Sequence, residues 1–166
     1  MKFDLSAGTT VFFNSLVRES TGVDLNGDGK ITGFDNYMLL FNGVNALQAN
    51  DDAWNTFGDG SVHHYDSTIT HTFATAGSYL ITVGHLAYSS ASALQGFDAG
   101  RPFVAYNGNE NFGAWRLNLS ATNGTVSNVH EVGVNAVPEP ASIALLGLGL
   151  AGAALARRKS KKATQA

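Results

Sequence analysis

The side chains between Asp24 and Asp35 have the types and spacing that suit a bound cation. In the segment DLNGDGKITGFD, oxygen-bearing side chains stand at positions one, three and five, and a glycine stands at position six. Calcium takes about six to eight oxygen ligands, and this spacing wraps several oxygens around one point. The sequence therefore predicts a calcium site, with a polar surface turn as the alternative. The candidate ligands are Asp24, Asn26, Asp28, the backbone carbonyl of Lys30, Thr32 and Asp35.

The same segment resembles the calcium loops of EF-hands and dockerins, with Gly29 at the sharp turn. It ends on Asp35 where an EF-hand has glutamate, a replacement that dockerins tolerate. Dockerin loops come in pairs, whereas this segment has no second copy in the sequence. A strand that followed the loop directly would draw Asp35 away from the other ligands.

A second group of acidic and amide residues follows in the polar stretch 50–66, namely Asn50, Asp51, Asp52, Asp59 and Asp66. These residues could form another calcium-stabilised loop. Carboxylates that simply face solvent are the alternative, and the sequence favours it.

The remaining polar residues do not assemble into a recognisable catalytic site. His63 and His64 are adjacent and would face opposite sides of a strand. His71 and His85 share the parity of apolar rows, which favours packing over metal binding. The chain has no cysteine, and no serine stands in a Gly-x-Ser-x-Gly motif. We therefore expect a non-enzymatic protein.

Aromatic residues are candidates for stacking on sugar rings, because an aromatic face packs against apolar surface. Trp54 lies in a polar stretch and is predicted to be exposed, so it is the first candidate for glycan binding. Trp115 alternates with Leu117 and Leu119 and is predicted to lie in the core. The other candidates are Tyr65, Tyr88 and Tyr106.

Alternating apolar and polar residues predict strands that position these side chains. Ile69, His71 and Phe73 would share one face of a strand, and Thr70 and Thr72 the other. A second apolar row consists of Tyr79, Ile81 and Val83. This alternation is typical of antiparallel sheets with one face in solvent.

Two similar segments, Phe3–Phe13 and Phe73–Val83, each place a glycine between apolar runs and are predicted to be β-hairpins. The apolar run NYMLLFN at residues 36–42 favours a buried strand over a short helix. Polar loops are expected at residues 50–66 and 95–113. Residues 121–137 read as a last strand or a linker.

The predicted fold over residues 1–135 is therefore an all-β, jelly-roll-like antiparallel β-sandwich. The segments FDNYMLLFNGVNALQANDD, YDSTITHTFATAGSYLITVGHL and GAWRLNL resemble the bacterial pre-peptidase C-terminal-like β-sandwich. That resemblance implies a non-catalytic binding or stabilising module.

The charge of the chain is unevenly distributed. Five of the ten basic residues lie at positions 157–162, which leaves five basic against thirteen acidic residues and a net charge of about −8 before them. A body this acidic repels phosphate backbones, so we expect no nucleic acid partner.

The sequence ends in an uncharged apolar segment, residues 141–156, between Pro138–Glu139–Pro140 and a basic cluster. As a helix this segment would span about 24 Å, slightly less than the hydrocarbon core of about 30 Å. Arg157 and Arg158 could extend to the lipid headgroups, and their charge would keep this end cytoplasmic. The sequence predicts a transmembrane helix here, with a buried core helix as the alternative.

The tail VPEPASIALLGLGLAGAALARRK resembles the PEP-CTERM sorting signal of Gram-negative bacteria, a segment also known as the ice-binding protein C-terminal domain. The matching positions are Val137, Pro138, Glu139, Pro140, Arg157, Arg158 and Lys159. The resemblance assigns residues 136–162 to the signal and 163–166 to a short tail. It implies recognition by an exosortase in the inner membrane and cleavage near the prolines. Release to the cell surface, or attachment to extracellular polysaccharide, would follow.

Such signals normally accompany an N-terminal signal peptide, whereas MKFDLSAGTTVFF has no apolar core of that length. We therefore expect the natural start of the protein to lie upstream. The sequence predicts an exported envelope or biofilm-matrix protein, with a calcium-dependent carbohydrate-binding module at the cell surface as the alternative function.

Overall fold

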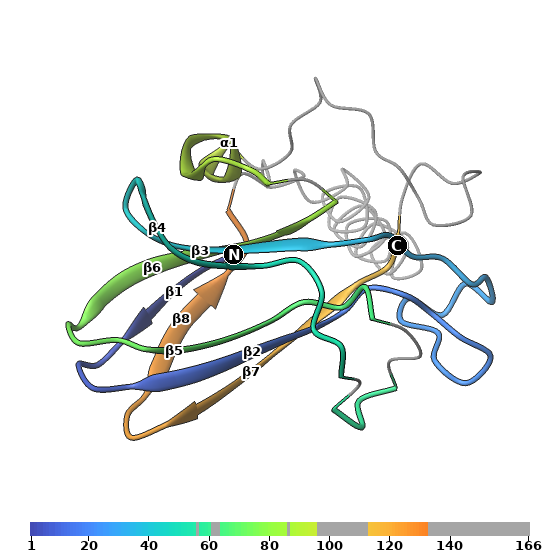
Figure 1. Cartoon of the computed structure of the whole chain (residues 1–166), viewed down its shortest axis with the longest axis horizontal. Helices are drawn as coiled ribbons and strands as arrows, with labels where there is room; N and C mark the ends of the chain where they lie inside the picture. The colour runs from blue at the N-terminus through green and yellow to red at the C-terminus, as the bar shows by residue number, and fades with distance from the viewer. Residues whose placement is uncertain (56, 61–63, 86, 96–112, 133–166) are drawn as a thin grey trace, which may run out of the picture. The chain divides into compact units, whose positions relative to one another are not determined.

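The computed structural model describes residues 1–55, 57–60, 64–85, 87–95 and 113–132 (Figure 1). The chain divides into two units, Met1–Gly133 and Val134–Ala166. The predicted transmembrane helix over 141–156 and the sorting signal fall in the second unit, outside the described residues. Among the residues that the structure describes, no helix has the length and hydropathy that a membrane span requires.

The described body consists of strands and one short helix. Their bounds are β1 (Lys2–Leu5), β2 (Thr10–Leu16), β3 (Tyr37–Asn42), β4 (Asn45–Asn50), β5 (Thr68–Thr72), β6 (Gly77–Gly84), α1 (Ser90–Leu94), β7 (Arg116–Thr122) and β8 (Val126–His130). The helix begins after Ser89, whose side chain accepts a hydrogen bond from the backbone N–H of Ser92.

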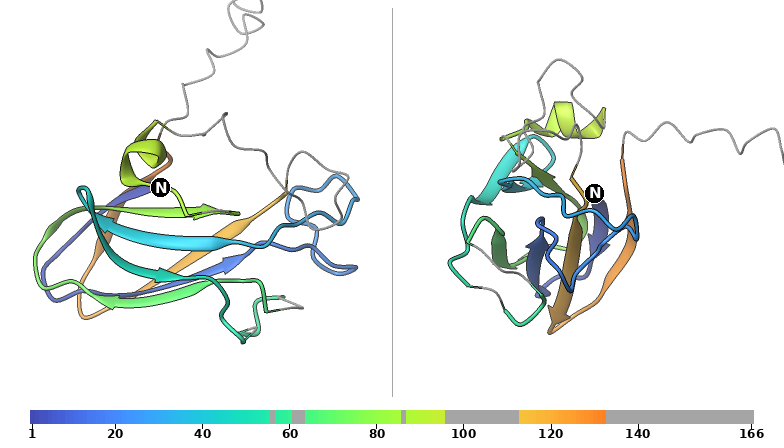
Figure 2. Two further views of the ribbon diagram at one scale, coloured as in Figure 1. Left: turned by 45° about the horizontal axis from the view of Figure 1, so that its top comes forward. Right: turned by 90° about the vertical axis from the view of Figure 1, so that its right-hand side faces the viewer.

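The strands form two layers (Figures 1 and 2). One sheet has five strands in the order β4-β3-β6-β1-β8, and the other has three in the order β5-β2-β7. Every pairing is antiparallel. The prediction of an all-β antiparallel body is confirmed, and the predicted C-terminal helix lies outside the described residues.

The two segments predicted to be hairpins instead connect the sheets, so that prediction is wrong. β1 and β2 lie in different sheets, as do β5 and β6. Both strands of each pair direct large apolar side chains toward one core, which they can fill from opposite sides only if the chain crosses between the layers. The ring centroids of Phe3 and Phe13 accordingly lie 5.4 Å apart across the core.

Three such connections, here called arches, join the sheets at residues 6–9, 73–76 and 123–125, at the same end of the body (Figure 1). Gly8 N donates to the carbonyl of Phe73, and Phe73 N donates to the carbonyl of Thr9, both at 2.8 Å. On the other side, Ser6 N donates to the carbonyl of Thr125 at 3.3 Å. Gly8 has a φ of +80°, which glycine adopts without a steric penalty. The arch at residues 6–9 therefore lies between the other two and hydrogen-bonds to both, just as β1 and β2 lie between their neighbours in the sheets.

The core lies between the layers and is rich in aromatic side chains. Phe73 packs edge-on against Tyr79 with centroids 4.5 Å apart. Leu117 and Leu119 pack partly buried against this core, but Trp115 is 41 % exposed, so its predicted core position is wrong. Trp115 precedes β7, an edge strand, and therefore lies where the sheet ends. The buried cluster comprises Phe3, Leu5, Val11, Phe13, Met38, Leu40, Ile69, Phe73, Tyr79 and Ile81.

The segment NYMLLFN forms strand β3, which confirms the strand over the helix, with Met38 and Leu40 fully buried. The sequence did not predict its partner β4, whose residues are mostly exposed and show no alternation. The two strands form a hairpin through the two-residue turn Gly43-Val44, where Gly43 has a φ of +57°. Glycine at the first central position is common in hairpin turns, so this local signal was present.

Candidate functional site

The first half of the predicted calcium loop is held together by its own side chains. Asp24 accepts hydrogen bonds from Gly27 N at 2.6 Å and Gly29 N at 2.9 Å. The hydrogen bond from Gly29 lowers the pKa of Asp24 most, so this carboxylate stays ionised to lower pH than usual. Asn26 and Asp28 bond each other twice at 3.1 Å, and Lys30 N donates to Asp28 at 2.8 Å.

In the second half of the loop, Thr32 makes its hydrogen bonds in the interior of the body and not with the first half. Thr32 is buried, and its hydroxyl donates to Glu19 Oε2 at 2.7 Å. The other oxygen of Glu19 accepts a hydrogen bond from Leu25 N at 2.7 Å. Glu19, which is 1 % exposed, thus joins both ends of the loop, a role that no sequence pattern indicated. The hydroxyl of Thr32 also accepts a hydrogen bond from Ala114 N at 3.0 Å. It therefore makes both of these hydrogen bonds inside the body and does not face the first half of the loop.

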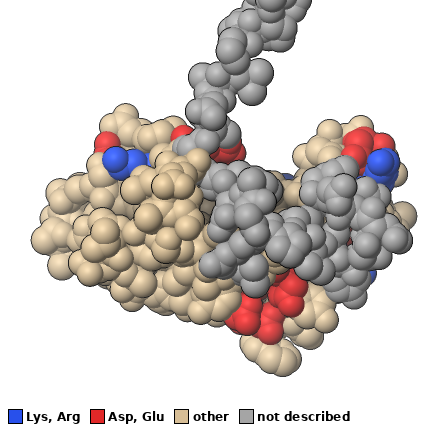
Figure 3. Space-filling model, turned by 90° about the horizontal axis from the view of Figure 1, so that it is seen from above, with Lys and Arg blue, Asp and Glu red and all other residues tan. Residues whose placement is uncertain are grey.

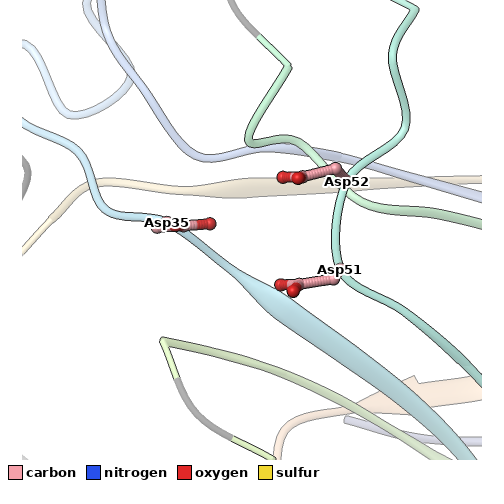
Figure 4. Close-up of side chains that lie close together, drawn as sticks. All are labelled: Asp35, Asp51 and Asp52. Atoms are coloured by element: carbon pink, nitrogen blue, oxygen red, sulfur yellow. The ribbon is translucent and has the colours of Figure 1, made fainter.

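The structure does not bring all six predicted ligands around one point, because Thr32 bonds Glu19 and Asp35 lies in another group. Among the described residues, Asp24 and Asp28 form no three-carboxylate group with Asp35. Asp35 instead lies beside Asp51 and Asp52, with ligand oxygens within 4.8 Å of one another (Figure 4). The physical reason is the one anticipated: β3 begins two residues after Asp35 and fixes the carboxylate at the end of its sheet.

Asp35 precedes β3, and Asp51 and Asp52 follow β4, so all three carboxylates lie at the open end of the β3–β4 hairpin. Their side chains point toward a shared space (Figure 4). Calcium–oxygen distances of about 2.3–2.6 Å place ligand oxygens on opposite sides of the ion about 5 Å apart. A group of oxygens within 4.8 Å of one another therefore fits a cation of this kind. Asp51 and Asp52 were predicted to belong to a second loop, and no sequence pattern connects them with Asp35.

A buried polar network positions Asp51 and Asp52. The hydroxyl of Ser67 donates to the carbonyl of Asp51 and to Asn36 Oδ1, the latter at 2.8 Å. Asn50 Nδ2 donates to the carbonyl of Asp52 at 3.3 Å, while its Oδ1 accepts from Thr68 N at 2.8 Å. The backbone that carries the two carboxylates is therefore held to β5 and to the start of β3.

The electrostatics of this group favour a proton or a cation. Asp35 is exposed, but its partial desolvation raises the pKa of its carboxyl, and the charges of Asp52 and then Asp51 raise it further. Asp52 Oδ1 is buried and accepts no hydrogen bond within the described residues. An ionised carboxylate oxygen that is removed from water without a donor is costly, and a bound cation would offset that cost.

Trp54 stands two residues after Asp52 and is 70 % exposed, which confirms its predicted exposure. Its ring lies 5.1 Å from that of His64, at an angle of 34°. Its φ of +59° is an uncommon backbone conformation for a bulky residue. The nearby Phe57 is 49 % exposed and has a φ of +48°. No sequence pattern singled out Phe57.

The other candidates differ in position. His71 packs against Phe73 with centroids 4.7 Å apart, as predicted. Tyr88 is half-buried and packs against Gly84, where a Cβ would lie 2.2 Å from its ring. Tyr65 is 36 % exposed. His63 and Tyr106 lie outside the described residues.

Acidic side chains gather in separate patches on the face shown in Figure 3, where basic side chains are few. This distribution agrees with the net charge of about −8 that precedes residue 157.

Comparisons with known proteins bear on the tail and not on the body. A search of curated proteins and a search of solved structures found no match to the chain. The resemblance of the body to pre-peptidase C-terminal-like domains therefore gains no support and stays a prediction. Residues 136–159 match the PEP-CTERM protein-sorting motif, which confirms the predicted signal. The chain thus carries a motif that indicates exosortase-dependent sorting of an exported protein.

Proposed function

We propose that this chain is a non-enzymatic protein of the bacterial envelope or biofilm matrix, with the β-sandwich as the exported cargo and the tail as its address. The observation that carries this proposal is the PEP-CTERM motif at residues 136–159. The apolar segment 141–156 holds the chain in the inner membrane until an exosortase acts near Pro138 and Pro140. The body then reaches the cell surface or the extracellular polysaccharide.

The intact mass of the exported protein tests this proposal. The chain would be expressed behind a working signal peptide in a host with an exosortase and in the same host without it. We expect loss of the residues after Pro-Glu-Pro only in the first host. An uncut, membrane-bound chain in both hosts would make the tail a permanent anchor and overturn the proposal.

The second candidate function is a calcium-dependent carbohydrate-binding module. It is favoured by the group of Asp35, Asp51 and Asp52, by the buried Oδ1 of Asp52, and by the exposed Trp54 next to them in the chain. In this function the cation would rigidify the loop after β4, and the indole of Trp54 would stack on a sugar ring.

Thermal unfolding of the full chain in calcium and in chelator tests this candidate. We expect calcium to raise the melting temperature of the wild type and of Asp28→Asn, but not of Asp52→Asn. The Asp28 variant is the matched control, because Asp28 belongs to the other loop. A calcium response that Asp28→Asn abolishes and Asp52→Asn leaves intact would return the site to residues 24–30. No response in the wild type would reject calcium binding.

A further inference from the structure

The outer face of the three-stranded sheet carries a regular array of hydroxyl groups. Thr10 of β2 lies opposite Thr72 of β5 and Thr122 of β7. In the next outward row, Phe12 lies opposite Thr70 and Ser120. Val11 and Phe13 are fully buried, so the side chains between and before them face away from the core. We call the five residues Thr10, Thr70, Thr72, Ser120 and Thr122 the hydroxyl shelf.

The hydroxyl shelf is accessible and ordered by its own contacts. Thr70, Thr72, Ser120 and Thr122 are exposed, and Thr10 is half-buried. The hydroxyls of Thr10 and Thr72 lie 2.8 Å apart and share a hydrogen bond across the strands. Rows on a strand repeat about every 6.8 Å and neighbouring strands lie about 4.8 Å apart. The shelf therefore presents hydroxyl groups at fixed intervals in two directions.

An aromatic step bounds the shelf on one side. The ring of Phe57 packs against Phe12 with centroids 5.1 Å apart and an angle of 63°. Beyond Phe12, the same face is covered: Asn14 is 5 % exposed and donates to Asp59 Oδ2 at 2.7 Å. Arg116 also contacts the segment that contains Asp59, because its Nη2 donates to the carbonyl of Asp59 at 2.9 Å.

The conformation of Phe57 is a second, independent observation. A bulky residue with a positive φ is strained, and such strain persists where the surroundings fix it, often at binding sites. Here it accompanies a Phe57 that is 49 % exposed and packs against Phe12 of the shelf face. An exposed ring beside a row of hydroxyls offers an apolar face and hydrogen-bonding groups to the same ligand.

The chemistry of the shelf selects a neutral, periodic ligand. None of its five residues is charged, and residues 1–135 have a net charge of −7, with twelve acidic and five basic residues, which repels polyanions. Sugars combine an apolar ring face, which packs on aromatic rings, with hydroxyls that pair with threonine and serine. We propose that the hydroxyl shelf and Phe57 bind a flat, extended, neutral polysaccharide. This inference rests on the proposed function only in requiring that the body is exported, and it involves neither calcium nor Trp54.

The test is sedimentation of the full chain with insoluble cellulose and chitin, in a polyoxyethylene detergent that carries no sugar headgroup. Alginate gel beads serve as the anionic comparison. Phe57→Gly removes the ring and leaves a residue that tolerates the positive φ. Thr70→Lys places a long charged side chain on the β5 side of the shelf, opposite Phe12. Thr21→Lys makes the same change at an exposed threonine in a distant turn.

We expect retention on cellulose or chitin, at least a tenfold weaker affinity for Phe57→Gly and Thr70→Lys, and less than a twofold change for Thr21→Lys. Melting temperatures of the variants confirm that each is folded. Three results would each overturn the proposal: no retention on either neutral polysaccharide, preference for alginate, or binding by both variants as by wild type. Loss of binding in Trp54→Ala and chelator, with Thr70→Lys unaffected, would assign glycan binding to Trp54 instead. Because binding is measured on purified chain, its failure is distinct from a failure of sorting.

Discussion

Asp35, Asp51 and Asp52 share one small volume, and this has a consequence for the pH dependence of stability. The pKa of Asp35 is raised by partial desolvation and by the two neighbouring carboxylates. The folded chain therefore binds a proton at Asp35 more readily than the unfolded chain does. Ionised Asp35 lowers the free energy of unfolding at pH values above its folded-state pKa. This decrease in the free energy of unfolding disappears as the pH falls through the folded-state pKa of Asp35, because the carboxyl is then protonated.

Asp35→Asn removes the charge and keeps the size of the side chain. In chelator at pH 7 we expect a higher melting temperature than that of the wild type, with the gain shrinking as the pH is lowered to about 4. Thermal unfolding followed by circular dichroism at several pH values measures this. Asp28→Asn, at an exposed carboxylate with local partners, should show no such gain. A lower melting temperature for Asp35→Asn at pH 7 would contradict the electrostatic argument.

Local spacing in the sequence predicted contacts between residues that are close in the chain and missed contacts between residues that are far apart in it. Asp24, Asn26 and Asp28 lie in one turn, and their hydrogen bonds span two to five residues. Asp35 meets Asp51 only because the β3–β4 hairpin brings its two ends together. Glu19 contacts Thr32 across 13 residues without any motif. Trp54 was predictable because exposure followed from its polar surroundings.

The arches show the same limit for whole strands. Alternation identified the strands around Ile69, Tyr79 and Leu117, since each pattern depends on the face of a single segment. It could not tell a hairpin from an arch, because both place two apolar runs on either side of a tight turn. The choice depends on whether the two rows fill the core from one side or from both.

Packing between arches makes Gly124 sensitive to substitution. A Cβ at this position would lie 2.0 Å from Thr9 Oγ1 and 2.7 Å from Ser6 Oγ. Thr9 is fully buried and donates to the carbonyl of Ser6 at 2.7 Å, so it has little room to move. We expect Gly124→Ala to lower the free energy of unfolding by about 1–3 kcal/mol, measured by urea denaturation.

Gly22→Ala is the matched control for this substitution. Gly22 also lies in a turn between paired residues, but a Cβ there meets nothing within 4 Å. Its effect should stay within about 0.5 kcal/mol. Equal effects of the two variants would show that the arches do not depend on close packing at Gly124.

Acidic and basic residues are distributed differently over the body and the C-terminal tail. The region before Arg157 is acidic, whereas residues 157–162 contain five basic residues and no acid. A cluster of basic residues beside an apolar segment sets its orientation in a membrane. In the proposed function the tail therefore sets which side of the membrane the body occupies, whatever the body binds.

Removing basic residues from the tail should weaken this orientation in proportion to the charge removed. We expect Arg157→Ser with Arg158→Ser, and Lys161→Ser with Lys162→Ser, each to reduce the fraction of chains with a cytoplasmic C-terminus, and their combination to reduce it further. Protease protection in membrane vesicles measures that fraction. The second pair lies outside the matched motif. An effect of the first pair alone would point to recognition by the exosortase rather than to charge.

The position of β8 has a mechanical consequence. β8 is an edge strand whose last residue, His130, pairs with Lys2, while its first residue, Val126, pairs with Leu5 beside the arches. The hydroxyl shelf reaches the arch end through Thr10, Thr72 and Thr122, each the strand residue next to an arch. A load applied between a polymer bound on the shelf, as proposed, and the chain that follows His130 would therefore run along the strands. It would shear the hydrogen bonds between β8 and β1 together rather than peel them one after another. In the proposed function, a body built this way would carry tension in the matrix through an edge strand.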